Sequence, residues 1–181
     1  MLTQDILNAL KAYTENLTSD VCFVLNEGEH AKRAELLEFL TSLASVSEKL
    51  SVDVREGLDL VRSPISFALE VDGQFNGIQF SGIPSGHEFN SLVLAILQSA
   101  GTPLKLDDSL VSLIHGVQEQ LHFEVFISLS CHNCPDVVQA LNVMSLLNPN
   151  ITHTMIDGDV YQDEVKNKKI MSVPTIFLNN E

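Results

Sequence analysis

The chain presents one order of elements twice, and this internal repeat limits the possible folds more than any other feature. Each copy is predicted to run helix, apolar strand, helix, strand, X-Pro and strand, from the periodicity of its apolar residues. The two apolar strands begin at residues 21 and 123, and the two prolines are Pro64 and Pro174. We therefore expect an α/β protein built from two copies of one unit.

The first copy is predicted to combine helices with short strands. Residues 21–25 are almost fully apolar, as is typical of a strand buried on both faces. Asp72 and Gly73 lie between two apolar runs, which is a hairpin signal. The predicted helices are 2–17, 31–45 and 87–99, and the predicted strands are 21–25, 52–54, 65–71 and 78–80.

The second copy repeats this scheme but stops early. The first copy continues for 37 residues past Pro64, to Gly101, whereas only seven residues follow Pro174. An unpaired strand edge is a liability, so we expect a fragment of a longer protein. The first fold is assigned to residues 1–103 and the second, truncated at its C-terminus, to residues 104–181. The second copy's predicted helices are 107–120, 134–147 and a short one that Asp159 caps, ending near 168; its predicted strands are 123–127, 151–156 and 175–179.

The net charge of −14 argues against two classes of partner. Nucleic-acid backbones and anionic membrane surfaces both favour clustered Lys and Arg. The N-terminal residues form an amphipathic helical pattern and not a secretory signal. No apolar stretch approaches the roughly 20 residues that span a bilayer. These features favour a soluble, cytoplasmic protein.

The chemistry of the chain is concentrated in Cys131-His132-Asn133-Cys134, which follows a buried strand and begins a helix. A helix N-terminus lowers the pKa of a thiol and so favours the reactive thiolate. Cys131 is expected to be exposed at this position, with Cys134 one turn deeper. The pattern indicates a disulfide exchange centre in which Cys131 attacks a partner disulfide and Cys134 resolves the mixed disulfide.

Val173-Pro174 supports the same interpretation, because it starts a strand some 40 residues after the cysteine pair. A cis peptide bond here places the backbone of Val173 beside Cys131, where it can pair with an extended partner peptide. The alternative is an ordinary trans proline at a strand start. The assembled order of strand, CxxC, helix, strand, helix, Val-Pro and strand favours the cis form.

Other interpretations of these residues remain. A structural zinc site needs four ligands, and CxxC supplies two, with no second close-spaced pair among the remaining Cys and His residues. His132 favours the thiolate if it is cationic, and is otherwise an exposed loop residue. Cys22 lies in an apolar strand and is interpreted as a buried, inert thiol.

The run SLSCHNCPDVVQALN (128–142), followed by VPTIF (173–177), resembles the thioredoxin superfamily. With GIPSGHEFNSLVLAIL (82–97) upstream and the tandem repeat, the whole chain resembles more narrowly the N-terminal domain of the flavoprotein subunit of bacterial alkyl hydroperoxide reductase. The resemblance implies two tandem thioredoxin-like folds that share a central mixed β-sheet. Only the second keeps its cysteines, and residues 29–32 stand where the first copy would carry CxxC.

The resemblance also implies a path for electrons. In that family they pass from NADH to FAD and to a second CxxC in a C-terminal flavoprotein part, then to the N-terminal CxxC, and finally to a peroxiredoxin disulfide. Cys131 matches the attacking cysteine, Cys134 the resolving one, and Glu88 an acidic residue near the attacking sulfur. This chain has no Gly-x-Gly-x-x-Gly motif, so no flavin or nicotinamide site is expected in it. No metal site is expected either, because CxxC supplies only two of the four ligands of a structural zinc site. The full-length protein is expected to be a homodimer.

Glu88 has two interpretations. A carboxylate near a thiol raises the pKa of that thiol and relays protons. A negative side chain in the first turn of a helix is favoured in any case.

Three functions follow from the sequence. The first is electron transfer to a peroxiredoxin in peroxide detoxification. The second is a stand-alone glutaredoxin-like protein disulfide oxidoreductase. The third is a non-catalytic interaction module with a structural CxxC.

Overall fold

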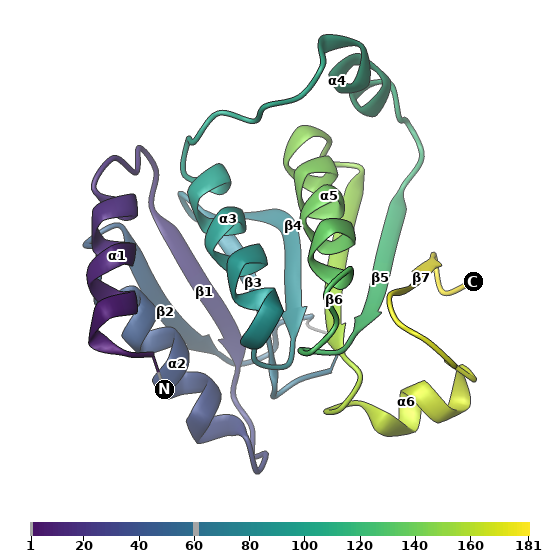
Figure 1. The fold of residues 1–181 in the computed structure, drawn as a ribbon, viewed down its shortest axis with the longest axis horizontal. Coiled ribbons are helices and arrows are strands. Elements are labelled where there is room, and N and C mark those ends of the chain that lie inside the picture. The colour runs from purple at the N-terminus through teal and green to yellow at the C-terminus, as the bar shows by residue number, and fades with distance from the viewer. Residues whose placement is uncertain (1, 60–61) are drawn as a thin grey trace.

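A computed structural model describes residues 2–59 and 62–181. Within these residues the strands form one seven-stranded mixed sheet, in the order β2-β1-β3-β4-β6-β5-β7 (Figure 1). The elements in chain order are α1 (Gln4–Thr14), β1 (Val21–Asn26), α2 (Arg33–Ala44), β2 (Leu50–Arg55), β3 (Ser66–Val71), β4 (Gln74–Ser81), the 3₁₀ helix η1 (Gly86–Glu88), α3 (Phe89–Ser99), α4 (Asp108–His115), β5 (Leu121–Ile127), α5 (Cys134–Leu147), β6 (Ile151–Asp157), α6 (Gln162–Asn167) and β7 (Thr175–Leu178).

The repeat predicted from the sequence is present in the sheet. In the first copy, β1 pairs in parallel with β2 and antiparallel with β3. In the second copy, β5 pairs in the same way with β6 and β7. The parallel pairing of β4 with β6 joins the two halves. The prediction of two tandem thioredoxin-like folds on a shared mixed sheet is therefore confirmed.

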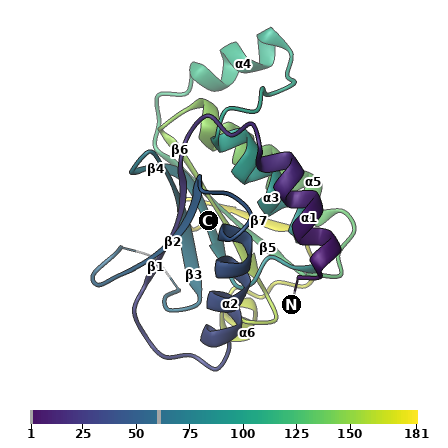
Figure 2. The same ribbon diagram turned by 90° about the vertical axis from the view of Figure 1, so that its left-hand side faces the viewer.

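The long helices α1, α2, α3 and α5 cover one face of this sheet (Figures 1 and 2). Because successive strand residues point to opposite faces, every second side chain meets these helices. The rings of Phe23, Phe67 and Phe80 form the centre of this core, and all three are fully buried. Phe67 stacks on Phe80 with 5.3 Å between ring centroids, and Phe23 meets Phe67 edge-on at 6.0 Å.

The turns and helix ends follow local chemistry, with two exceptions. The predicted hairpin is present, since Asp72 and Gly73 adopt φ angles of 48° and 80° between β3 and β4. The helix predicted over 107–120 is shorter, because Gly116 stands at the C-cap of α4. The prediction that Asp159 caps the next helix is wrong. Its backbone N–H donates to the Asp157 carboxylate in a tight turn, and α6 begins only after Tyr161.

Of the helices in the described part of the chain, none is both long enough and apolar enough to cross a bilayer.

Candidate functional site

The two cysteines of the CxxC motif lie where β5 gives way to α5, as predicted. Cys131 and Cys134 form a disulfide, with 5.6 Å between their Cα atoms. Cys134 is the first residue of α5 and is fully buried, whereas Cys131 is half-buried in the preceding turn. The backbone N–H of Cys134 points at the Cys131 sulfur, with 3.2 Å between nitrogen and sulfur. The outer sulfur therefore lies at the positive end of the helix.

The Val173-Pro174 segment lies against the same sulfur. The peptide bond between these residues is cis, as predicted, and so is the bond between Ser63 and Pro64 in the first copy. The Val173 carbonyl oxygen lies 4.0 Å from the Cys131 Sγ. Val173 is 36% exposed. A groove of about 390 Å³ runs beside it, lined by Ile127, Ser128, Val165, Ile170, Met171 and Val173 among others.

A turn of the first copy packs against the cysteine loop of the second. The backbone N–H of His87 donates to the Leu129 carbonyl oxygen at 3.1 Å. The His87 ring meets the His132 ring edge-on, with 4.2 Å between centroids. Gly86 has φ of +55°, and a Cβ there would stand 2.6 Å from the Leu129 carbonyl oxygen. The close approach of the two copies therefore depends on glycine at this position.

Glu88 belongs to the same turn, and its side chain is fully buried. Glu88 also lies in the first turn of η1 and at the N-cap of α3, so its position at a helix start is as the alternative interpretation expected. Within the described residues neither carboxylate oxygen has a hydrogen-bond partner. Burial raises the pKa of Glu88 by penalising the charged form, and the neighbouring Ser91 hydroxyl acts in the opposite direction. The result is a carboxyl that keeps its proton to higher pH than an ordinary glutamate.

Cys22 is less buried than expected. It is half-buried, although Val24 and Asn26, which point to the same face of the sheet, are buried. Burial still raises the pKa of the Cys22 thiol, and a hydrogen bond with Ser51 opposes the shift. Among the described residues, no group of three or more His, Cys, Asp or Glu side chains is arranged to hold a metal ion.

The equivalent site of the first copy is filled by an arginine. Arg33 is the first residue of α2, as Cys134 is the first residue of α5. When the two helices are aligned by their first residues, residues 30–33 correspond to Cys131–Cys134. From the sequence we expect this segment one residue earlier, at 29–32. The Arg33 guanidinium is buried and donates to the carbonyl oxygens of Pro64 and Asn26, each at 2.5 Å. Sequence reasoning missed this contact and that of His87, since each joins segments far apart in the chain.

Known proteins with similar sequences include a thioredoxin-domain family and two longer bacterial proteins. A thioredoxin-domain family model matches residues 121–181. The chain is 48% identical, over all 181 residues, to a protein named NADH dehydrogenase from Bacillus subtilis and to the F subunit of alkyl hydroperoxide reductase from Staphylococcus aureus. It covers 35% and 34% of these proteins, so the chain spans about a third of the length of the curated relatives it matches.

Solved structures agree with these relatives. The N-terminal domain of the alkyl hydroperoxide reductase AhpF from Enterococcus faecalis (V583) superposes with a TM-score of 0.91 at 33% identity, covering 100% of this chain and 92% of that one. A protein disulfide oxidoreductase from Aeropyrum pernix shares the fold, with a TM-score of 0.84 at 21% identity and coverage of 99% and 85%.

Replacing Gly86 tests the close approach of the two copies. Gly86→Ala should lower the free energy of unfolding by about 1–3 kcal/mol, because its methyl group meets the Leu129 carbonyl. Gly73→Ala is the matched control, since Gly73 also has positive φ, +80°, but open space around it. Urea denaturation measures both. Equal losses in the two variants would show that backbone conformation alone, and not contact with Leu129, explains the glycine.

The raised pKa of Glu88 predicts a pH-dependent stability. As pH rises above 4.5, the ordinary glutamate value, the unfolded chain releases this proton before the folded chain does. Stability is therefore lost until the folded carboxyl also ionises. Glu88→Gln should be more stable than wild type at neutral pH, and the difference should vanish below about pH 4.

Denaturation curves across pH measure this effect. Glu119→Gln, at an exposed glutamate, is the control and should show no such trend. A Glu88→Gln difference that stays constant with pH would contradict the pKa assigned to the buried carboxyl.

Proposed function

The chain belongs to the family of N-terminal domains of the alkyl hydroperoxide reductase AhpF, and from this premise we propose that it carries electrons from a flavoprotein disulfide reductase to the disulfide of a peroxiredoxin. One observation supports the proposal above the others. Cys131 and Cys134 form a disulfide in which Cys131 is half-buried and Cys134 is fully buried. The Cys131 sulfur lies beside the backbone of Val173. That asymmetry suits a centre that forms a mixed disulfide with another protein.

The proposed reaction transfers two electrons. In the reduced chain the Cys131 thiolate attacks one sulfur of the partner disulfide, and the other partner sulfur leaves as a thiolate that takes up a proton. The Cys134 sulfur then loses its proton and attacks Cys131, which closes the disulfide seen here and releases the second partner thiol. The partner is reduced to a dithiol and the chain is oxidised.

The surrounding residues are assigned to three tasks. The backbone of Val173, held by the cis bond to Pro174, pairs with the partner segment that carries the attacked cysteine. His132 lies exposed between the two cysteines and contacts that segment. Glu88, whose pKa is raised by burial, exchanges protons with the cysteines as they change state.

The electron source is proposed to lie elsewhere in the longer relatives. This chain contains no Gly-x-Gly-x-x-Gly segment, so its residues do not fit a dinucleotide. FAD and NADH are therefore assigned to the remaining two thirds of those proteins, one of which is named NADH dehydrogenase. The first copy, residues 1–103, is proposed to be redox-inactive, because Arg33 stands where the inner cysteine stands in the second.

Serine substitutions separate the roles of the cysteines. Pre-reduced wild-type chain should reduce an oxidised peroxiredoxin, whereas Cys131→Ser should lose this activity by a factor of about 10³ or more because the nucleophile is gone. Cys134→Ser should instead accumulate a mixed disulfide with the partner, visible on a non-reducing gel. Cys22→Ser is the control and should react as wild type does. Unchanged rates in Cys131→Ser would remove the catalytic interpretation and leave an interaction module.

A further inference from the structure

We propose that Arg62 and Glu164 are positioning residues, through which the redox-inactive copy holds the partner-binding segment of the active copy in place. The positioned segment is residues 169–174, between α6 and β7, which carries Val173 and Pro174. The inference rests on the proposed function in one respect, namely that Val173 contacts the partner. It adds a role for side chains on the sheet face opposite the long helices.

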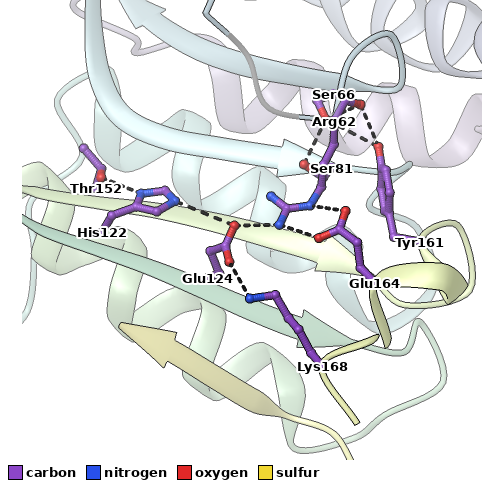
Figure 3. A network of polar contacts seen from close by, with 9 residues as sticks. All are labelled: Arg62, Ser66, Ser81, His122, Glu124, Thr152, Tyr161, Glu164 and Lys168. Atoms are coloured by element: carbon purple, nitrogen blue, oxygen red, sulfur yellow. Dashed lines mark hydrogen bonds and ion pairs between the residues drawn. The ribbon is translucent and has the colours of Figure 1, made fainter. Parts of the chain in front are cut away.

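Arg62 is the centre of the network (Figure 3). It comes from the first copy, just before Ser63-Pro64, and its side chain is only 5% exposed. Its Nη2 lies 2.6 Å from Glu124 Oε1, on β5. Its Nε and Nη2 bind the two carboxylate oxygens of Glu164, on α6, each at 2.8 Å. This bidentate pair fixes orientation as well as distance.

A second contact reaches the other end of the segment. Lys168, at the C-terminal end of α6, has its Nζ 3.7 Å from Glu124 Oε2. The same ammonium stands 4.1 Å from the ring centroid of Phe177, on β7. A cation over an aromatic face is an attractive contact. The network therefore contacts the chain before residues 169–174, at Glu164 and Lys168, and after them, at Phe177.

Tyr161, the N-cap residue of α6, binds the backbone of Arg62. Its hydroxyl donates to the Arg62 carbonyl oxygen at 2.9 Å and lies 3.3 Å from that of Ile65. Burial raises the pKa of Tyr161 to about 12, so the hydroxyl keeps the proton that it donates. The backbone of Arg62 thus contacts the N-cap residue of α6, and its side chain contacts Glu164 within the helix.

These polar contacts matter because α6 has little else to hold it. The helix has six residues, none of them buried, and no side chain caps its N-terminus. Helices of this length are not stable by themselves. Val160 and Tyr161, just before the helix, pack against the core, but no residue within α6 is buried, so the Arg62 network carries much of its placement. Residues 169–174 begin where α6 ends, and the placement of Val173 depends on it.

Glu164 is the residue to change, because its removal leaves no charge buried alone. The Glu164 side chain is 33% exposed, and without it Arg62 still pairs with Glu124. Arg62→Met is less informative, since it leaves Glu124, 4% exposed, without its main partner and risks unfolding. Glu70→Gln is a matched control. Glu70 also binds an arginine through both oxygens, Arg55 at 2.9 Å each, but on strands β2 and β3 of the first copy.

The test compares Glu164→Gln with Glu70→Gln in two measurements on the full chain. The first is amide hydrogen exchange over residues 169–176, which should be about tenfold faster in Glu164→Gln and unchanged in Glu70→Gln. The second is single-turnover oxidation of pre-reduced chain by an oxidised peroxiredoxin and by dithiobis(nitrobenzoic acid), a small disulfide. For the peroxiredoxin, the half-saturating concentration should rise about fivefold in Glu164→Gln. The rate with the small disulfide should not change.

The outcomes distinguish this inference from the proposed function. Equal exchange in the two variants would overturn the positioning role, whatever the partner is. Faster exchange with unchanged half-saturation for the peroxiredoxin would overturn the claim that positioning serves partner binding. If wild type reduces the small disulfide but no peroxiredoxin, the proposed function fails, and the exchange comparison still decides whether Glu164 holds the segment.

Discussion

The parallel pairing of β4 with β6 is the contact on which the rest of the structure depends. It joins Ile78–Ser81 of the first copy to His153–Ile156 of the second and makes one sheet from two repeats. Because the strands are held side by side, the loops at their ends meet. On one side of the sheet the turn around His87 packs on the cysteine loop, and on the other Arg62 reaches Glu124. Both contacts cross the seam that this pairing creates.

The two copies have therefore diverged in role while keeping one architecture. In the second copy the first position of the helix is a cysteine that forms the disulfide. In the first copy the same position is Arg33, whose guanidinium donates one hydrogen bond to the Pro64 carbonyl oxygen and one to that of Asn26, at the end of β1. The first copy has no cysteine at that position, but the guanidinium of Arg62 reaches Glu124 and Glu164 of its neighbour.

Local patterns in the sequence were sufficient to predict most of the elements and the central pair of residues. The helix that begins at Cys134, the hairpin at Asp72 and the cis bond before Pro174 each depend on neighbouring residues or on a short assembled motif. What the sequence could not predict depends on contacts over long separations. Arg62 meets Glu164 across 102 positions, and nothing near either residue indicates the pairing. The prediction that Asp159 caps α6 failed for a local reason, since its backbone N–H donates to the Asp157 carboxylate in a turn that ends before α6 begins.

Selective alkylation tests most directly the claim that Cys131 alone is presented as a nucleophile. The reduced chain is treated with less than one equivalent of iodoacetamide at neutral pH, and the modified cysteine is identified by mass spectrometry. We expect Cys131 to react at least about tenfold faster than the other two cysteines. Cys134 is fully buried, and Cys22 is half-buried with a raised pKa. Comparable labelling of Cys131 and Cys134, or faster labelling of Cys22, would contradict this claim.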